Sequence, residues 1–185
     1  MPDRLHFTDS DEANALIGCD PMALLVGLAL DQQVTVQQAF LGPLRLRERL
    51  CAIDADTLAT AELVPAFREK PAVHRYPAKM AERVRDLAVH VRDNYGGDAE
   101  RVWTDAPDAE TLRANIAALP GFGEMKVKAL GAILAKRFGI EAADGLVPPH
   151  PTLGDVDSPE ALLDYQAAKR EHKAEWTKMK TRGSS

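Results

Sequence analysis

The sequence predicts an all-α fold, and three observations support this prediction. Apolar residues recur at helical spacing along most of the chain, proline and glycine separate these stretches, and strand-like alternation is scarce. The chain has 185 residues and 45% hydrophobic content, so it can bury a sizeable core. We therefore expect one compact domain or two small helical lobes that share a cleft.

The first strong helix signal is the stretch 22–30, which is apolar on all sides and therefore fits a buried helix. Pro21 suits its first position, and the polar run Asp31-Gln32-Gln33 ends it. Three more helical patterns follow at residues 34–51, with a break near Gly42-Pro43, at 54–67, and at 78–94, where Met80, Val84, Leu87 and Val91 share one face.

Two further helices flank a short turn in the second half of the chain. Their apolar faces are Leu112, Ile116 and Leu119 in the first, and Val127, Leu130, Leu134 and Phe138 in the second, which Gly139 ends. Three prolines and two glycines make residues 141–157 read as a long loop. The predicted divisions are an N-terminal segment at 1–19, a helical core at 20–140, the long loop at 141–157 and a C-terminal basic helix at 158–185.

Composition argues against several kinds of site. Cys19 and Cys51 each lack a second cysteine nearby, which excludes a disulfide framework and a four-thiolate or iron–sulfur site, and we expect both to be buried and inert. We expect no metal and no cofactor. No apolar run approaches the roughly 20 residues that span a bilayer, and the N-terminus lacks a signal-peptide pattern. A cytoplasmic protein without membrane contact is therefore expected.

The distribution of charge matters more than the net charge of −5. An acidic chain does not coat nucleic acid by bulk attraction, because the phosphates repel it. Residues 119–140, however, carry four basic side chains against one acidic side chain, and residues 163–185 carry six against three. These two basic islands can hold DNA on one face, although such runs are also common on ordinary solvated helices.

The most informative segment is the hairpin Leu119-Pro120-Gly121-Phe122-Gly123 between two predicted helices. Gly121 and Gly123 permit a tight turn, and Phe122 anchors it in the core. The second helix then starts abruptly, so its first N–H groups point outward with the positive end of the helix dipole and can seat a phosphate. Lys126 and Lys128 add positive charge for neighbouring phosphates. A tight interhelical turn without a ligand is the alternative.

Together with Glu124-Met125-Lys126-Val127, this segment resembles the hairpin signature of the helix-hairpin-helix/Gly-Pro-Asp superfamily of base-excision DNA glycosylases. Two more segments resemble the family in the same order: Leu30-Asp31-Gln32-Gln33-Val34 is similar to its Gln-Gln segment, and residues 78–84 are similar to the helix before the hairpin. The resemblance covers roughly residues 20–140 and is closest to short, cysteine-poor actinobacterial members.

This resemblance implies a helix-hairpin-helix glycosylase-like fold with a reduced second lobe. It also implies damaged double-stranded DNA as the partner, bound by a monomer at the bacterial nucleoid. In the family a glutamine enters the duplex at the space left by the flipped base, and Gln32 and Gln33 stand at that place. An amide can replace the hydrogen bonds of the orphaned base while its flat face stacks. A solvated helix end is the alternative for these two residues.

The sequence departs from the family at the position of the nucleophilic lysine of bifunctional members, where it has Met125. Lys126 is one place later and, at about 100° of rotation per residue, should point elsewhere. The resemblance then favours a monofunctional glycosylase, in which an aspartate stabilises the oxocarbenium-like sugar and helps water attack. Asp157 and Asp155 are the candidates, Asp144 fits less well, and helix capping is the alternative for Asp155 and Asp157.

The expected function is a DNA-binding base-excision repair protein, specifically a monofunctional DNA glycosylase that hydrolyses the N-glycosidic bond of a flipped damaged base. Two alternatives remain open. The first is a non-catalytic DNA-binding or lesion-sensing protein that keeps the hairpin. The second is a helical interaction module without a nucleic-acid role.

Overall fold

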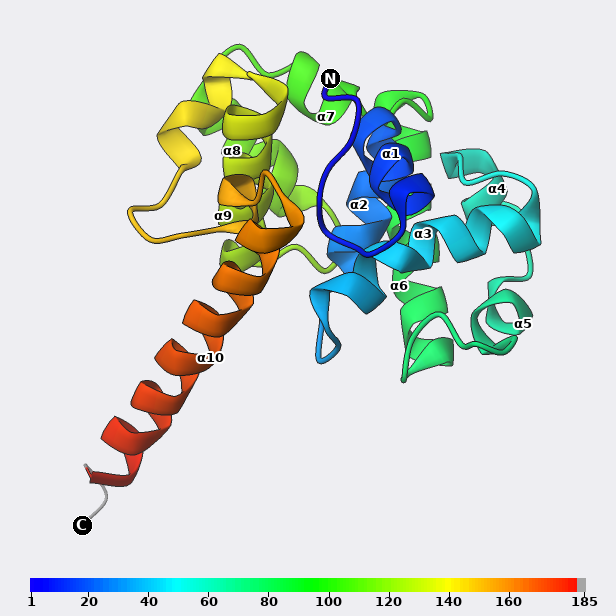
Figure 1. Cartoon of the computed structure of the whole chain (residues 1–185). Coiled ribbons are helices and arrows are strands. Elements are labelled where there is room, and N and C mark those ends of the chain that lie inside the picture. The colour runs from blue at the N-terminus through cyan, green and yellow to red at the C-terminus, as the bar shows by residue number, and fades with distance from the viewer. Residues whose placement is uncertain (183–185) are drawn as a thin grey trace.

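The computed structural model describes residues 1–182, which contain no β-strand, so the all-α prediction is confirmed for them (Figure 1). The helices gather in two lobes. The first, called the N-terminal lobe, contains α1 (Asp11–Cys19), α2 (Pro21–Leu30), α3 (Val36–Leu50), α4 (Ala55–Thr60), α5 (Leu63–Arg68) and α6 (Pro77–Tyr95).

The second lobe, called the hairpin lobe, contains the rest of the chain up to the last helix. Its elements are α7 (Arg101–Thr104), α8 (Ala109–Ala118), α9 (Glu124–Ile133), the π-helical turn η1 (Leu134–Phe138) and the 3₁₀ turns η2 (Glu141–Leu146) and η3 (Leu153–Asp155). The last helix, α10 (Pro159–Arg182), starts at the hairpin lobe and projects away from both lobes (Figure 1). Residues 183–185 of the predicted C-terminal helix lie outside the described residues.

Helix α2 belongs to the core of the N-terminal lobe. Its residues from Met22 to Leu30 are all buried, as its apolar sequence predicts. The side chain of Asp20 caps the helix by accepting a hydrogen bond from the N–H of Ala23 at 3.0 Å, and Pro21 takes the first position. Because every face of α2 is apolar, the polar residues that follow it emerge directly from the core.

Helix α3 runs through Gly42 and Pro43 without a break, so the predicted break is wrong. Close packing on α2 explains this difference. A Cβ on Gly42 would lie 2.4 Å from the Leu30 Cδ1 atom, and a Cβ on Gly27 would lie 2.4 Å from the Phe40 Cδ1 atom. The two glycines let the helices approach closely, and the apolar burial at this contact offsets the hydrogen bond that Pro43 cannot donate.

The predicted stretch 54–67 forms two short helices, α4 and α5, rather than one. The chain turns at Ala61, which is extended, and the Ala61 carbonyl accepts a hydrogen bond from Arg85 of α6 at 2.6 Å. Helix α6 itself agrees with the prediction, since it buries the predicted face formed by Met80, Val84, Leu87 and Val91.

The predicted loop at 141–157 is largely packed structure. The turns η2 and η3 lie on α9, because a Cβ on Gly154 would lie 2.4 Å from the Ala132 carbonyl oxygen and a Cβ on Gly131 would lie 2.5 Å from the Leu146 Cβ. The segment buries Ala143, Leu146, Leu153 and Val156. Such short 3₁₀ turns give no periodic pattern, which is why the sequence reads as a loop.

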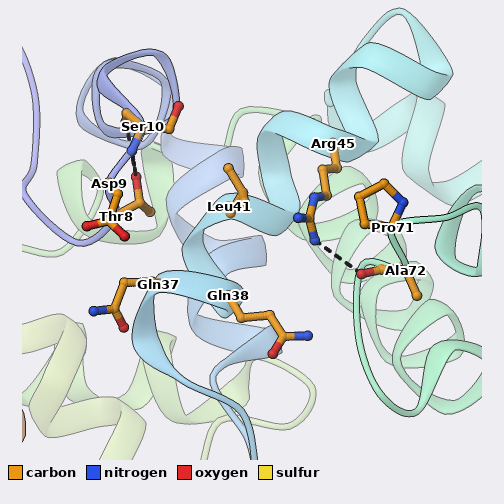
Figure 2. A pocket seen from close by; sticks show the side chains of 9 residues that line it. All are labelled: Thr8, Asp9, Ser10, Gln37, Gln38, Leu41, Arg45, Pro71 and Ala72. Atoms are coloured by element: carbon orange, nitrogen blue, oxygen red, sulfur yellow. Dashed lines mark hydrogen bonds between the residues drawn. The ribbon is translucent and has the colours of Figure 1, made fainter.

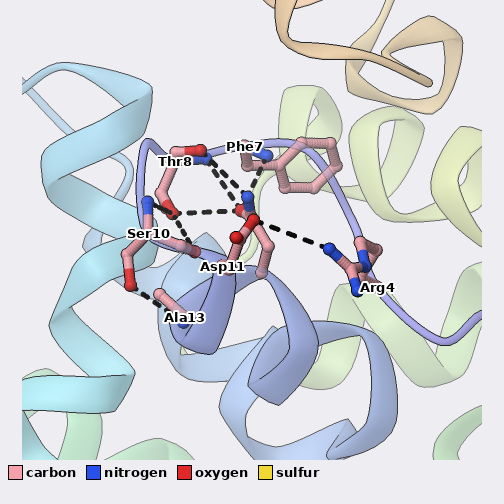
Figure 3. A network of polar contacts seen from close by, with 7 residues as sticks. Arg4, Phe7, Thr8, Ser10, Asp11 and Ala13 are labelled. Atoms are coloured by element: carbon pink, nitrogen blue, oxygen red, sulfur yellow. Dashed lines mark hydrogen bonds and ion pairs between the residues drawn. The ribbon is translucent and has the colours of Figure 1, made fainter.

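Polar contacts tie the N-terminal segment to its lobe (Figure 3). The backbone N–H groups of Phe7 and Thr8 donate to the Asn14 side-chain oxygen at 3.2 and 2.9 Å. Arg4 pairs with Asp11 at 3.5 Å. Residues 1–19 therefore form part of the N-terminal lobe and include all of α1.

Both cysteines are exposed, so the prediction that they are buried is wrong. Cys19 is the last residue of α1, and Cys51 follows the last residue of α3 with a positive φ of 65°. At these positions the chain leaves the core. No single helix among residues 1–182 has the length and apolar composition to cross a membrane. Helices α1 and α2 meet these criteria only when they are taken together, and the pair is bent by 114°.

Candidate nucleic-acid interface

The predicted hairpin connects α8 to α9. Gly121 has a φ of +81°, which side chains rarely tolerate, and the N–H of Phe122 closes the turn on the Leu119 carbonyl at 3.0 Å. Phe122 is only 5% exposed, so its ring anchors the turn in the core. The turn therefore holds the start of α9 in a fixed position.

The N-terminus of α9 is open to an acceptor from outside the protein. Gly123 is its N-cap residue and supplies no capping side chain. Within residues 1–182, no group accepts a hydrogen bond from the backbone N–H of Glu124 or Met125. A Cβ on Gly123 would meet nothing within 4 Å. Two free N–H groups at the positive end of a helix dipole, with open space before them, suit a phosphate oxygen.

The two lysines after the turn point in different directions. Lys128 stays on the outer face of α9, with its Nζ atom 3.6 Å from a Glu124 oxygen, and Glu124 also pairs with Arg113 of α8 at 2.5 Å. Lys126 turns inward, and its Nζ atom donates to the Ala29 carbonyl of α2 at 3.2 Å. Of the two lysines predicted to contact phosphate, Lys128 is thus on the surface and Lys126 joins the two lobes.

A turn with unusual backbone geometry after α2 separates the roles of the two glutamines. Gln33 has a positive φ of 57°, is exposed, and makes no side-chain hydrogen bond within residues 1–182. Gln32 is held at both ends, because His74 Nε2 donates to its carbonyl at 3.1 Å and Arg83 donates to its side-chain oxygen. The Tyr76 N–H donates to His74 Nδ1 at 3.1 Å, which leaves the ring proton on Nε2. Gln33 is therefore the glutamine that is free to reach a partner.

The three segments singled out in the sequence meet around Arg83 of α6. Its guanidinium donates to Gln32, and its side chain also lies against the hairpin, since a Cβ on Gly121 would lie 3.0 Å from the Arg83 Cδ atom. The hydrogen bond from Lys126 to the Ala29 carbonyl is a second link. We call this contact the lobe seam; it comprises residues 29–33, Arg83, Gly121, Lys126 and the first turns of α10.

Charged and titratable side chains from several elements face one another at the lobe seam. Burial raises the pKa of Asp31, and the positive charges of Lys169 and Lys126 oppose this rise. Burial lowers the pKa of Lys126 to about 8, with Arg83 adding to the decrease and Asp31 opposing it. Burial and the neighbouring Asp31 charge raise the pKa of Tyr165 to about 12. The lobe seam is therefore polar and partly shielded from water.

Helix α10 lies along one end of the lobe seam. The side chains of Gln37 in α3 and Gln166 in α10 exchange two hydrogen bonds, at 3.1 and 2.6 Å. The Lys169 ammonium lies 5.8 Å from the centre of the Tyr165 ring. These contacts fix the beginning of α10 against the N-terminal lobe, whereas the side chains described beyond residue 167 are exposed.

The two predicted catalytic aspartates lie elsewhere in the hairpin lobe. Asp155 in η3 accepts hydrogen bonds from the N–H and the hydroxyl of Thr152 at 2.7 and 3.0 Å, and it pairs with Lys136. Burial alone would raise the pKa of Asp155, but the hydrogen bonds with Lys136 and Thr152 outweigh it, so the pKa is lowered. Asp157 is exposed. Within residues 1–182, neither side chain makes a hydrogen bond or an ion pair with the lobe seam.

A separate groove of about 510 Å³ lies beside α3 (Figure 2). Across it Arg45 donates to the Ala72 carbonyl at 3.2 Å, which ties α3 to the loop after α5. The groove is lined by Thr8, Asp9, Ser10, Gln37, Gln38, Leu41, Arg45, Pro71 and Ala72. None of the predicted site residues lines it, so we place it outside the candidate site.

Asp31, Tyr165 and Lys169 of the lobe seam were not predicted as site residues, and Lys126 was predicted to contact phosphate rather than to join the lobes. Some of these features had a signal in the sequence. Lys126 precedes Leu130 by four residues, which places the lysine on the buried side of α9. Asp31 directly follows an entirely apolar helix, so its position near the core was also readable. The contact of Tyr165 and Lys169 with the lobe seam depends on how α10 packs and has no signal in the sequence.

Among the residues that the structure describes, no three His, Cys, Asp or Glu side chains gather in a way that could hold a metal ion. No protein-family model matches the chain, and neither a curated protein nor a solved structure matches it significantly. A functional assignment therefore rests on the geometry of the hairpin and the lobe seam.

Proposed function

We propose that this chain is a base-excision repair protein that binds damaged double-stranded DNA and hydrolyses the N-glycosidic bond of a flipped base as a monofunctional DNA glycosylase. The helix-hairpin-helix glycosylase-like fold with a reduced second lobe is part of this proposal, as is action in the cytoplasm. The observation that supports it most is the meeting of the hairpin, the glutamine turn and α6 at one seam, linked by Arg83. A plain interhelical turn needs neither a free helix N-terminus nor an exposed glutamine beside it.

The geometry suggests how a duplex would be held. The N–H groups of Glu124 and Met125 would donate to one phosphate, and Lys128 would add charge beside it, which positions the protein without reading sequence. Gln33 would enter the duplex where the flipped base leaves, and its amide would offset part of the few kcal/mol lost on unstacking. The flipped base would enter the lobe seam.

A non-catalytic lesion-sensing protein is the second candidate, and one observation favours it. Asp155 is occupied by Thr152 and Lys136, and Asp157 is exposed, so within residues 1–182 neither predicted carboxylate makes a hydrogen bond or an ion pair with the lobe seam. Met125 is 81% exposed and offers no nucleophile on the outer face of α9. A protein of this kind would bind lesions and leave the glycosidic bond intact.

The variant Gly123→Asp tests DNA binding through the hairpin. Aspartate is a good N-cap residue, so the variant should be as stable as the wild type or slightly more stable. Its carboxylate would occupy the phosphate position, so affinity for an undamaged duplex should fall about tenfold or more, measured by fluorescence anisotropy between about 50 and 200 mM salt. The control Ser10→Asp adds the same charge at the N-cap of α1. Salt-independent binding, or equal affinities for both variants, would contradict the proposal.

A panel of lesions separates the enzyme from the sensor. Duplexes that carry uracil, hypoxanthine, oxidised guanine or alkylated purines are incubated with the protein and then treated with alkali, which breaks strands at abasic sites. A glycosylase gives strand breaks with at least one duplex. Tight, lesion-dependent binding without any strand break would establish the sensor instead.

A further inference from the structure

Asp31 carries a carboxylate at the lobe seam that has no direct partner. Its backbone N–H donates to the carbonyls of Gly27 and Leu28 at 3.1 and 3.3 Å, so the residue is fixed as the C-cap of α2. Within residues 1–182, its side chain makes no hydrogen bond and no ion pair. Asp31 is partly buried. Because carboxylates shielded from water are normally hydrogen-bonded or paired, a side chain in this condition needs an explanation.

The groups that face Asp31 are positively charged but held away from it. Lys126 from α9 donates to the Ala29 carbonyl at 3.2 Å, and Lys169 from α10 lies over the Tyr165 ring at 5.8 Å. Both lysines act on Asp31 through their field, and Tyr165 faces the same charge. The carboxylate therefore remains ionisable at the lobe seam, and its oxygens are free to bind a ligand.

We propose that Asp31 is the catalytic carboxylate of this protein, which takes a proton from the water that attacks C1′ of a flipped deoxynucleotide at the lobe seam. This inference rests on the proposed function. It assigns the chemistry to the residue immediately before the two glutamines, rather than to Asp155 or Asp157.

The reaction balances with water as the only co-reactant. The water oxygen forms a bond to C1′, the C1′–N bond breaks, and its electron pair leaves with the base. The proton that Asp31 accepts is passed on to the departing base, so one water is consumed and a free base and an abasic sugar are formed. The negative charge of Asp31 also stabilises the positive charge that develops on the sugar.

The surroundings of Asp31 suit a general base better than those of Asp155. A base works best when its pKa lies near the working pH, and burial raises the pKa of Asp31 while hydrogen bonds lower the pKa of Asp155. The position of Asp31 in the chain also favours it. Asp31 directly precedes Gln32, and Arg83 holds the side chain of Gln32 beside the hairpin.

The test compares Asp31→Asn with Asp157→Asn on the lesion panel under single-turnover conditions. Asparagine has the shape of aspartate, so Asp31→Asn should fold, and DNA affinity should stay equal or rise because a negative charge is lost. Its rate of abasic-site formation should be at least about 100-fold below the wild type. Asp157→Asn, at an exposed position, should keep the wild-type rate.

The outcomes separate the two proposals. A wild-type protein that forms abasic sites and an Asp31→Asn variant that forms them at a similar rate would overturn the role of Asp31 and leave the proposed function standing. A wild-type protein that forms none on any duplex would overturn both. If Asp31→Asn does not fold, Asp31→Glu keeps a carboxylate and should retain activity, and complete loss in that folded variant would count against the proposal.

A pH profile distinguishes catalysis from a structural role. The single-turnover rate should rise with pH as Asp31 loses its proton and then level off. Lys169→Met removes a positive charge that lowers the pKa of Asp31, so this rise should move to higher pH. A rise that stays at the wild-type pH in Lys169→Met would show that the titrating group is not Asp31.

Discussion

The outer part of the hairpin lobe and the lobe seam use charged side chains in different ways. On the outer part, Asp155 contacts Lys136, and Glu124 contacts both Arg113 and Lys128. At the lobe seam, Asp31 faces two lysines without touching either. Contact pairs fix the shape of the chain, whereas a carboxylate held only in a positive field keeps its oxygens available. The difference separates charges that stabilise the fold from charges that can act on a ligand.

The largest expected difference in stability is between the two aspartates. Asp155→Ala removes the hydrogen bonds with Thr152 and leaves Lys136 without its partner, so the free energy of unfolding should fall by about 1–3 kcal/mol. Asp31→Asn should leave it unchanged or raise it, because a partly buried charge without a direct partner is removed. Urea unfolding of both variants at neutral pH measures this. A larger loss in Asp31→Asn than in Asp155→Ala would reverse the comparison.

The pH dependence of stability should have opposite signs for the two aspartates. The folded-state pKa of Asp155 lies below the ordinary value of 3.8, so its stabilising effect is present above that pH and is lost as the pH falls through the folded-state pKa. The folded-state pKa of Asp31 lies above 3.8, so stability is lost as the pH rises through it. The free energy of unfolding of each variant is measured from acid to neutral pH and compared with the wild type. Asp155→Asn should lose less stability as the pH falls, and Asp31→Asn should lose less stability as the pH rises.

Some residues in this comparison could be predicted from the sequence and others could not. The all-α fold, the buried α2 and the anchoring Phe122 follow from apolar spacing and from glycine at the turn, which are local properties. One partner of Asp155, Thr152, is also close to it in sequence. Capping was the expected alternative to a catalytic role for Asp155. The positive charges that act on Asp31 come from α9 and α10, far along the chain, so only tertiary packing brings them close to it.

Lys126 is the next largest test of the lobe seam. Its folded-state pKa of about 8 lies below the ordinary 10.5, so the unfolded chain holds more protons between these values and stability should rise as the pH rises from about 8. The free energy of unfolding is compared at pH 7.5 and at about 9.5, a range that lies below the ordinary pKa of tyrosine. Lys126→Met should lack this rise, whereas Lys128→Met, at a surface pair, should keep it. An equal rise in both variants would place the responsible group elsewhere.

The smallest expected effect concerns Lys128 on the outer face of α9. Its pair with Glu124 is exposed, so Lys128→Gln should change the free energy of unfolding by less than about 0.5 kcal/mol. If Lys128 contacts a phosphate beside the hairpin, the variant should weaken binding to all duplexes alike and reduce the salt slope by about 1. Lys126→Gln should change the slope less, since Lys126 is turned to the Ala29 carbonyl. The reverse order would mean that DNA phosphates reach the lobe seam itself, and that its charges bind the backbone rather than the flipped base.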